Sequence, residues 1–305
     1  MKSAIITGAT GFIGSWLVEE LIAHNIDVTI LICDDLHRLP ANLLEKVRDI
    51  KYDPKEIFKV AQQIDHGYDV FYNLGWGGVA PEHKNNIKIQ LENVSSSVDA
   101  VYFSKSIGCK LFIGAGTVAE YVYCDGLISG RQQPSPADIY GAAKVSAHHM
   151  CEVAAKNIEQ DVIWTIISST FGERRLDNNL ITYTIRTLLN GDKPIYTGLE
   201  QMWDFLYIKD TVRALYLIGE KGITGKTYGI GSGIYRPLYE YINIIRDCID
   251  PNLTLGVGEI PYKNDKVSSS CVDNKELVED TGFLPSISFK EGIEKTIQYF
   301  KENNV

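Results

Sequence analysis

The sequence predicts an α/β protein built on a doubly wound parallel sheet, with a smaller C-terminal α/β cap. Short apolar runs alternate with helical segments over residues 3–168, which is typical of parallel strands covered by helices on both faces. A glycine-rich turn joins the first apolar run to the first helical segment. The 305 residues are enough for such a sheet and a second, smaller unit.

The individual elements follow from hydrophobic periodicity. Ser3–Thr7 is a short apolar run, and Phe12–His24 carries apolar residues at helical spacing. After Thr170 the alternation becomes irregular, which indicates the cap. The other predicted strands are 27–32, 69–74, 110–114 and 162–168, and the other predicted helices are 86–107, 141–157 and 178–190.

The first turn predicts a Rossmann domain that binds a dinucleotide. Gly8, Gly11 and Gly14 have the spacing G-x-x-G-x-x-G between the first strand and the first helix. Such glycines allow a tight turn, close approach of the main chain to a pyrophosphate, and close helix–strand packing. The helix N-terminus adds N–H donors, so the residues expected to hold the phosphates are Gly8, Thr10, Gly11, Phe12, Ile13 and Gly14.

We expect the domain boundaries to follow this pattern. The dinucleotide-binding domain is predicted to cover residues 1–169, with 203–231 returning to it. The substrate-binding cap is then made of 170–202 and 232–305. No repeat or clear linker separates the two parts, so they are expected to share an interface.

Composition excludes several classes of protein. The net charge of −9 argues against a nucleic-acid binder, which would carry a basic face. The first apolar run starts at Ala4, and no apolar stretch reaches the roughly 18 residues of a membrane span, so neither a signal peptide nor membrane association is expected. Six scattered cysteines without a C-x-x-C pair indicate reduced thiols in a cytoplasmic protein and no metal site.

The residues after the second strand bear on which dinucleotide binds. An acidic residue closing that strand would bond the ribose 2′-hydroxyl and favour NAD. Asp34 stands slightly late for this role, and Arg38 is suited to a 2′-phosphate. We therefore expect NADP, with NAD as the alternative. Asp53 ends a candidate third strand at 50–53 and is expected near the adenine.

A second constellation predicts proton transfer. Tyr140 and Lys144 are four residues apart, on one face of a helix. A nearby ammonium would lower the pKa of the tyrosine towards neutrality, and such a tyrosine can exchange a proton with a substrate oxygen. Thr117 follows the fifth strand, at the sheet edge where parallel-sheet sites form, and can hydrogen-bond a substrate carbonyl.

The glycine turn, the threonine and the Y-x-x-x-K pair together resemble the extended short-chain dehydrogenase/reductases, and within them the NAD-dependent epimerase/dehydratase family acting on nucleotide sugars. The resemblance covers essentially the whole chain. It implies that Thr117, Tyr140 and Lys144 form a catalytic triad and that the last two also contact the cofactor. Further cofactor contacts are expected from Leu74, Gly75 and Asn93, and substrate contacts from Trp76, Thr117, Glu120, Tyr140, Asn179 and Arg236.

Departures from the family pattern narrow the expected reaction. Val118 and Ala119 stand where 4,6-dehydratases of this family carry Asp-Glu, so elimination is not expected. No cysteine precedes Cys124 after Thr117, which argues against 3,5-epimerising reductases. Trp203 replaces a usual arginine, which puts the expected nucleotide contacts in doubt.

The resemblance therefore implies NADPH-dependent reduction of the 4-keto group of a nucleotide-linked (6-deoxy)hexose, as in reductases similar to CDP-abequose synthase. A nucleotide-sugar 4-epimerase with tightly bound NAD is the alternative, and a non-catalytic dinucleotide sensor is the second. A homodimer is expected, formed by the helices at 86–107 and 141–157, because the second of these carries more apolar surface than one sheet face needs.

Overall fold

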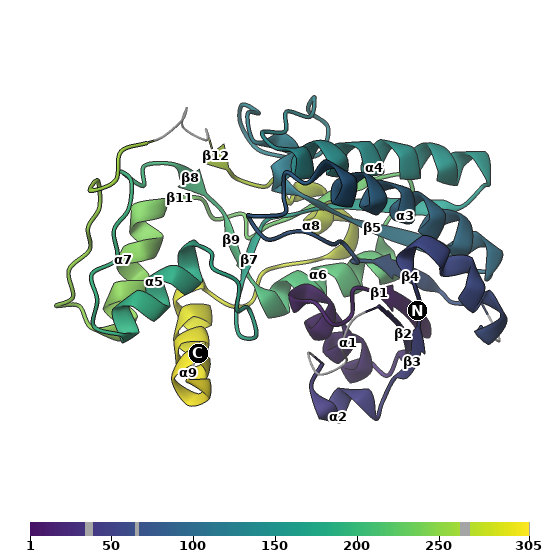
Figure 1. Cartoon of the computed structure of the whole chain (residues 1–305), viewed down its shortest axis with the longest axis horizontal. Helices are drawn as coiled ribbons and strands as arrows, with labels where there is room; N and C mark the ends of the chain where they lie inside the picture. The colour runs from purple at the N-terminus through teal and green to yellow at the C-terminus, as the bar shows by residue number, and fades with distance from the viewer. Residues whose placement is uncertain (34–38, 65–66, 263–268, 305) are drawn as a thin grey trace.

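The computed structural model describes residues 1–33, 39–64, 67–262 and 269–304. Within these residues, seven strands form one sheet in the order β10-β6-β5-β4-β1-β2-β3, and every neighbouring pair is parallel (Figure 1). This confirms the predicted doubly wound sheet. The strands are β1 (Ser3–Thr7), β2 (Asp27–Ile32), β3 (Arg48–Lys51), β4 (Val70–Asn73), β5 (Leu111–Thr117), β6 (Asp161–Ile167) and β10 (Thr227–Ile230).

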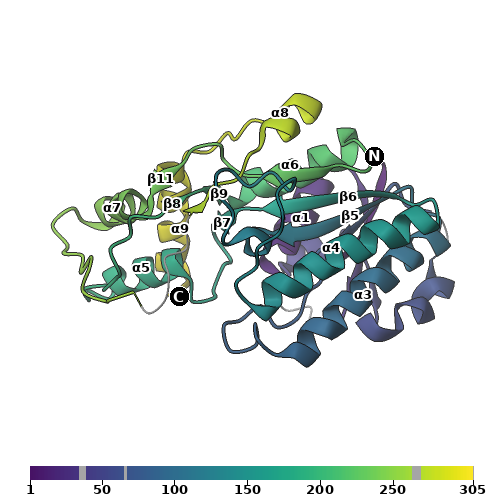
Figure 2. The same ribbon diagram turned by 90° about the horizontal axis from the view of Figure 1, so that it is seen from above.

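Helices cover both faces of the sheet, as the apolar strands require. Alternate residues of one strand belong to different cores, since Ala4 and Ile6 pack with one buried cluster and Ile5 with the other. One face carries α3 (Ile87–Ser106), α4 (Ile139–Asn157) and the 3₁₀ segment η2 (Pro54–Gln63), and the opposite face carries α1 (Phe12–Ala23), α6 (Ile208–Lys221) and α8 (Lys275–Thr281) (Figure 2).

The cap lies beyond the carboxyl ends of the central strands (Figure 1). Its helices are α5 (Leu180–Leu189), α7 (Leu238–Ile249) and α9 (Phe289–Asn303), which pack on one another. Two small sheets connect it to the main sheet: β7 (Ser169–Phe171) with β9 (Phe205–Tyr207), and β8 (Met202–Trp203) between β11 (Arg236–Pro237) and β12 (Ser269–Ser270).

The chain crosses between the two parts more than once. β10, which lies in the segment 203–231, pairs with β6 and completes the main sheet. Helix α8 packs beside α6 and β10, although its residues belong to the 232–305 segment assigned to the cap. The short helices α2 (Ala41–Leu44) and η3 (Val118–Tyr121) complete the described elements.

Some element ends differ from the sequence prediction, and side-chain capping and strand register account for two of them. Helix α4 begins at Ile139, two residues before the predicted start, because the Asp138 side chain caps it by accepting a 2.7 Å hydrogen bond from Gly141 N. Strand β5 continues past Gly114 to Thr117, in register with β6. Strand β3 ends at Lys51, so Asp53 lies just beyond it.

No helix among the described residues is long and apolar enough to cross a membrane. The described part of the chain also holds no cluster of three or more His, Cys, Asp or Glu that could bind a metal ion. All six cysteines lie in described residues, and no disulfide joins them.

Candidate active site

The glycine turn between β1 and α1 has the geometry that a bound pyrophosphate requires. Gly8 has φ +72°, a conformation that L side chains rarely adopt, and a Cβ there would lie 2.6 Å from Gly75 N. A Cβ on Gly14 would overlap the carbonyl oxygen of Gly8. The first glycine therefore permits contact with the end of β4, and the third permits the helix to pack on the turn.

The N-terminus of α1 is open to an anion. Its N-cap residue, Gly11, is exposed and has no side chain that could bond to the N–H groups of the first turn. That turn includes Phe12 and Ile13. Helix N–H groups that no side chain caps attract phosphate. Thr10 beside them is nearly buried. These residues fit the predicted dinucleotide.

The end of β4 is fixed against the same turn. Thr7 Oγ1 donates to Asn73 Oδ1 at 2.7 Å and accepts from Gly75 N at 3.2 Å. The side-chain amide of Asn93 makes two further hydrogen bonds with Gly77. Its Oδ1 accepts from Gly77 N at 2.9 Å, and its Nδ2 donates to Gly77 O at 2.8 Å. The predicted cofactor residues Leu74 and Gly75 thus lie beside Gly8, whereas the Asn93 side chain supports the main chain of this loop.

Thr117, Tyr140 and Lys144 come together at the carboxyl end of β5. Thr117 is the last residue of β5 and the N-cap of η3, where its side chain accepts a hydrogen bond from Ala119 N. Tyr140 and Lys144 lie on the first two turns of α4. Lys144 is almost fully buried and donates a 2.7 Å hydrogen bond to Ala115 O, two residues before Thr117.

Burial dominates the ionisation of both helix residues. It raises the pKa of Tyr140 to about 12, although the hydrogen bond with Thr117 and the charge of Arg175 act in the opposite direction. It lowers the pKa of Lys144 to about 8, against the attraction of the Glu120 carboxylate. The expectation that Lys144 lowers the pKa of Tyr140 is therefore wrong for the cofactor-free protein, because desolvation is the stronger effect.

Trp76 lies against both Tyr140 and Lys144 of α4. The Lys144 Nζ is 3.8 Å from the centre of the Trp76 ring, and the Tyr140 ring meets it edge-on with centroids 6.2 Å apart. The indole Nε1 donates a 2.9 Å hydrogen bond to Gln90 Oε1, which fixes the orientation of the ring. The predicted substrate residue Trp76 is thus part of the wall around the triad.

Glu120 does not fit the predicted contact with substrate. Its side chain is fully buried, and Oε1 accepts a 2.8 Å hydrogen bond from Thr117 N. The other oxygen, Oε2, lies 3.3 Å from His148 Nδ1. A carboxylate with no exposed surface supports the main chain of Thr117 from inside the protein, and it is not available to a ligand.

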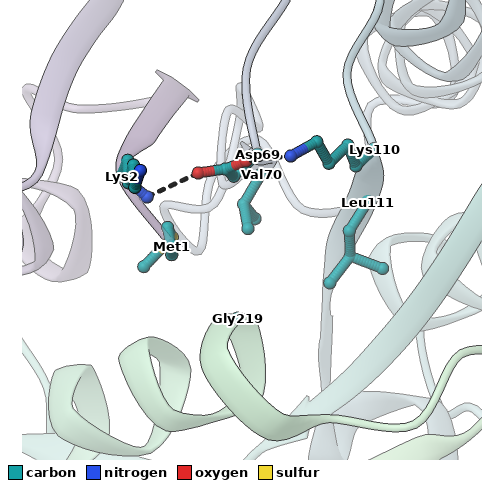
Figure 3. A pocket seen from close by; sticks show the side chains of 7 residues that line it. All are labelled: Met1, Lys2, Asp69, Val70, Lys110, Leu111 and Gly219. Atoms are coloured by element: carbon teal, nitrogen blue, oxygen red, sulfur yellow. Dashed lines mark hydrogen bonds and ion pairs between the residues drawn. The ribbon is translucent and has the colours of Figure 1, made fainter.

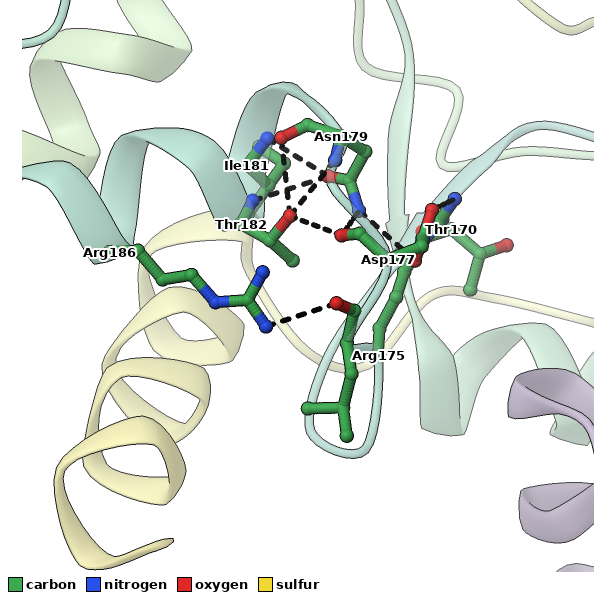
Figure 4. Close-up of polar contacts among 8 residues, drawn as sticks. Thr170, Arg175, Asp177, Asn179, Ile181, Thr182 and Arg186 are labelled. Atoms are coloured by element: carbon green, nitrogen blue, oxygen red, sulfur yellow. Dashed lines mark hydrogen bonds and ion pairs between the residues drawn. The ribbon is translucent and has the colours of Figure 1, made fainter. Parts of the chain in front are cut away.

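The loop after β7 brings a cation to the site. Arg175 is half-buried; its guanidinium lies 5.4 Å from the Phe12 ring and donates to Asp177 Oδ1 at 2.8 Å (Figure 4). Asn179 caps α5 by accepting from Ile181 N at 3.0 Å and Thr182 N at 3.2 Å, and its Nδ2 donates to Asp177. Both ends of the Asn179 side chain are thus used within the protein, so the predicted diphosphate contact would require this network to open.

The remaining predicted residues lie farther out. Arg236 on β11 is exposed, pairs with Glu240 at 3.6 Å, and lies in register with Trp203. Asp53 caps η2 and lines a shallow hollow of about 380 Å³ at the carboxyl end of β3. Asp34 and Arg38 lie outside the described residues.

A hollow of about 440 Å³ lies at the opposite edge of the sheet, between the amino ends of β1, β4 and β5 and Gly219 of α6 (Figure 3). Two of its charged side chains, Asp69 and Lys110, are paired with each other. Asp69 accepts from Lys2 N at 2.5 Å and from Lys110 Nζ at 2.7 Å, and these bonds lower the pKa of Asp69 to about 2. We therefore place the functional site at the other edge.

The site geometry agrees with the comparison to known proteins. The model of the NAD dependent epimerase/dehydratase family matches residues 4–231. The chain belongs to this family. The matched residues contain the glycine turn, the three residues of the triad and β10.

Relatives and solved structures agree in fold and length. A dTDP-glucose 4,6-dehydratase of Neisseria gonorrhoeae is 25% identical, covering 99% of this chain and 96% of the relative. The structure of DesIV, a dTDP-glucose 4,6-dehydratase of Streptomyces venezuelae with NAD and TYD bound, superposes with a TM-score of 0.88 at 20% identity over 99% of this chain and 98% of that chain. A UDP-glucose 4-epimerase of Thermotoga maritima gives 0.86 at 19% identity over 99% and 100%.

These findings name NAD and give no support to the preference for NADP. The family description reads NAD dependent, and the DesIV structure contains NAD.

Three residues near the triad were not singled out from the sequence. Arg175 belongs to a pair of consecutive arginines after a strand end, which is an unusual feature in an acidic chain. Lys84 lies 5.2 Å from the centre of the Tyr140 ring. His148, one helical turn beyond Lys144, could have been found by extending the spacing of the Tyr–Lys pair.

Proposed function

We propose that this protein reduces the 4-keto group of a nucleotide-linked (6-deoxy)hexose with a nicotinamide dinucleotide. The observation that carries the proposal is the set of side chains on η3. Val118 and Ala119 follow Thr117, and Glu120, the one carboxylate of η3, is fully buried. The site has the groups for proton transfer at one oxygen, whereas η3 offers no exposed acid or base for elimination at neighbouring carbons.

The triad supports this reaction in defined roles. The bound dinucleotide would supply the hydride to the carbonyl carbon. Tyr140, whose pKa is raised to about 12, is protonated at neutral pH and would protonate the carbonyl oxygen. Thr117 would orient that oxygen, and Lys144 would hold the ribose next to the nicotinamide.

Tyr140 would move its proton in opposite directions in the two candidate reactions. A 4-epimerase begins by oxidising a hydroxyl, so its tyrosine must first take a proton. A ketoreductase needs its tyrosine to give one, as the protonated Tyr140 of the cofactor-free protein could do. The 4-epimerase nevertheless remains the second candidate, because it would use the same three side chains.

The nucleotide sugar itself is proposed from the family and from the substrates that the relatives' names contain. Arg175 is our candidate for the contact with a diphosphate, because its guanidinium lies beside Phe12 at the start of α1 and has N–H groups beyond those that bond to Asp177 and Thr170. Asn179 and Arg236 stay predictions for the same ligand. A dinucleotide sensor without chemistry would have no need of Tyr140 and Lys144 at one sheet edge, so we place it last.

Turnover with defined sugars tests the proposal. Purified protein is mixed with NADH or NADPH and a 4-keto-6-deoxyhexose linked to each of dTDP, CDP, GDP and UDP. Stoichiometric loss of absorbance at the reduced nicotinamide band with one of these sugars is expected. Interconversion of two 4-epimers with no net change in the dinucleotide, by protein that carries tightly bound NAD, would instead establish the epimerase.

A homodimer is proposed for the outer face of α3 and α4. Apolar side chains on this face are exposed, with Leu91 62% accessible on α3 and Met150 50% and Val153 60% accessible on α4. The two helices pack side by side (Figure 2). Exposed apolar groups on neighbouring helices are suited to a twofold contact with the same face of a second copy.

A further inference from the structure

Helix α4 carries a row of polar residues that extends beyond the catalytic pair. Tyr140, Lys144, His148 and Glu152 are spaced four apart, so each lies about one turn further along the same side of the helix. His148 is 2% exposed, although histidine is ordinarily only partly buried. The proposed chemistry uses the first two members of the row and assigns no part to His148.

His148 bridges two carboxylates of different exposure. Its Nδ1 lies 3.3 Å from Oε2 of Glu120, which is fully buried, and its Nε2 lies 3.3 Å from Oε1 of Glu152, which is 39% exposed. Thr227 Oγ1 on β10 is also 3.3 Å from Nε2. Glu120 in turn holds the main-chain N–H of Thr117, so a continuous chain of polar contacts leads from solvent to the triad.

Packing fixes the histidine ring in this place. The ring stacks on Trp164 of β6 with centroids 4.7 Å apart and planes 5° apart. Two glycines of β5 leave the space that this arrangement occupies. A Cβ on Gly114 would overlap the Trp164 ring, and a Cβ on Gly116 would lie 2.5 Å from Glu120 Oε1.

The charges around His148 favour the imidazolium. Burial opposes the charge, but the hydrogen bonds to Glu120 and Glu152 and the attraction of both carboxylates outweigh it and raise the pKa of His148 to about 8. The groups that face the ring are Glu120 from η3, Glu152 and His149 from α4, Trp164 from β6 and Thr227 from β10.

The same Glu120 carboxylate acts on the catalytic groups. Its charge raises the pKa of Lys144 and contributes to the raised pKa of Tyr140. A positive charge on His148 opposes that field. If His148 lost its charge, the negative charge of Glu120 would be less compensated at Tyr140. The pKa of Tyr140 would then rise further, and Tyr140 would be a weaker acid.

Resting on the ketoreductase proposed above, we propose that His148 is a positioning residue of the active site. As an imidazolium between Glu120 and Glu152, it fixes the carboxylate that holds Thr117 and balances the negative field at Tyr140 and Lys144. It does not touch the substrate. The exposed end of the chain, at Glu152, makes this balance sensitive to the pH of the solvent.

An NMR titration tests the charge without any substrate. The imidazole signals of the cofactor-free protein are followed from pH 5 to pH 10, and His148 is assigned by comparison with His148→Asn. We expect His148 to titrate near pH 8 and Glu152→Gln to move that transition to lower pH. A transition at or below 6.5, the ordinary pKa of histidine, would refute the proposal.

The same titration can follow the amide of Thr117. We expect its chemical shift to change with the titration of His148 in the wild type and to lose that change in His148→Asn. An amide signal that is indifferent to His148 would remove the link to the active site. This measurement needs no activity, so it stands even if the proposed reaction is wrong.

Kinetics supply the second test, with a distant exposed histidine as the control. His148→Asn is expected to lower kcat by roughly tenfold, while KM and the dinucleotide Kd change by less than about threefold. His24→Asn, at the C-terminus of α1 on the opposite face of the sheet, is expected to leave all three unchanged. Equal kinetics for both variants would overturn the proposal.

A third variant guards against simple loss of structure. Glu152→Gln keeps a hydrogen-bond acceptor for His148 Nε2 and removes only the outer charge. We expect a folded protein whose kcat declines at lower pH than that of the wild type. A pH profile that coincides with the wild type contradicts the proposed charge balance, even if His148→Asn fails to fold.

Discussion

The Lys144 ammonium lies 3.8 Å from the centre of the Trp76 ring and donates its 2.7 Å hydrogen bond to Ala115 O. The lysine is therefore held between an aromatic face and the end of β5, away from water. Desolvation by this arrangement lowers the pKa of Lys144 to about 8. Because the ring lies on the loop after β4 and the carbonyl group belongs to β5, the position of Lys144 depends on how these two neighbouring parts of the chain pack together.

Trp76→Ala should raise the pKa of Lys144 towards its ordinary value, because water would enter beside the ammonium. The pKa can be measured by NMR after isotopic methylation of the lysines, with Lys144→Arg used for assignment. Trp76→Phe keeps an apolar ring in place and should leave the pKa near 8. An unchanged pKa in Trp76→Ala would show that the indole does not desolvate Lys144.

Tyr140→Phe should abolish most turnover, by about 10² to 10⁴-fold, since the phenyl ring cannot protonate the carbonyl oxygen. The Kd of the dinucleotide should stay within a few-fold, because the ring and its contact with Trp76 remain. Tyr102→Phe, which removes a partly exposed hydroxyl on α3, is the control and should be fully active. Normal turnover by Tyr140→Phe would remove Tyr140 from its role as the acid.

The stability of the wild type relative to His148→Asn should depend on pH. The pKa of His148 in the folded protein, about 8, lies above the ordinary value of 6.5 that it has in the unfolded chain. The imidazolium therefore stabilises the folded state fully below pH 6.5 and loses this effect as the pH rises through 8. The difference corresponds to about 2 kcal/mol. Urea unfolding of both proteins at pH 6 and pH 9 measures it, and a difference independent of pH would contradict the charged state of His148.

Arg38→Ala should weaken NADPH binding much more than NADH binding if this side chain meets a 2′-phosphate. Fluorescence titration of the wild type and of Arg38→Ala gives the ratio of their Kd values, once for NADPH and once for NADH. The family description and the DesIV structure name NAD, so this experiment decides between the preference inferred from the sequence and the cofactor of the relatives. Equal effects on the two dinucleotides would end the assignment of Arg38.

Val153→Glu should convert the proposed dimer to a monomer, because it places a charge on the exposed apolar face of α4. Sedimentation velocity at several protein concentrations gives the mass of the species. Leu284→Glu is the matched control, since Leu284 is 63% exposed, compared with 60% for Val153, but lies away from α3 and α4. A wild type that sediments as a monomer would disprove the dimer directly.

The sequence was sufficient for the fold and for placing Tyr140 and Lys144 on one helix, because both depend on short-range patterns. Alternating apolar runs predict the parallel sheet, and the spacing of Tyr140 and Lys144 places them on one helix face. The surroundings of these residues depend on contacts distant in the chain. Trp76 covers Lys144 although the two residues are 68 positions apart in the sequence. No local pattern shows that Tyr140 is buried, and it is this burial that raises its pKa.

Glu120 shows the same limit. The family resemblance implied a ligand contact for Glu120, but the 3₁₀ segment η3 directs the side chain inward to Thr117 N and His148. The buried Glu120 side chain has its partner in His148, which lies 28 residues later in the sequence. Arg175 likewise reaches Phe12 because the loop after β7 packs on α1, where Trp16 Nε1 donates a hydrogen bond to Glu173 O.

The two glycines of β5 set a rule for engineering this site. Gly116 has no room for a Cβ while Glu120 and Trp164 keep their places, and Gly114 has none beside Trp164. A single substitution at either glycine would therefore displace the indole, the carboxylate or both. A Cβ at 116 would also overlap the main-chain oxygen of Thr165, so even smaller residues at both 120 and 164 would not make room for a side chain there unless β6 also moved.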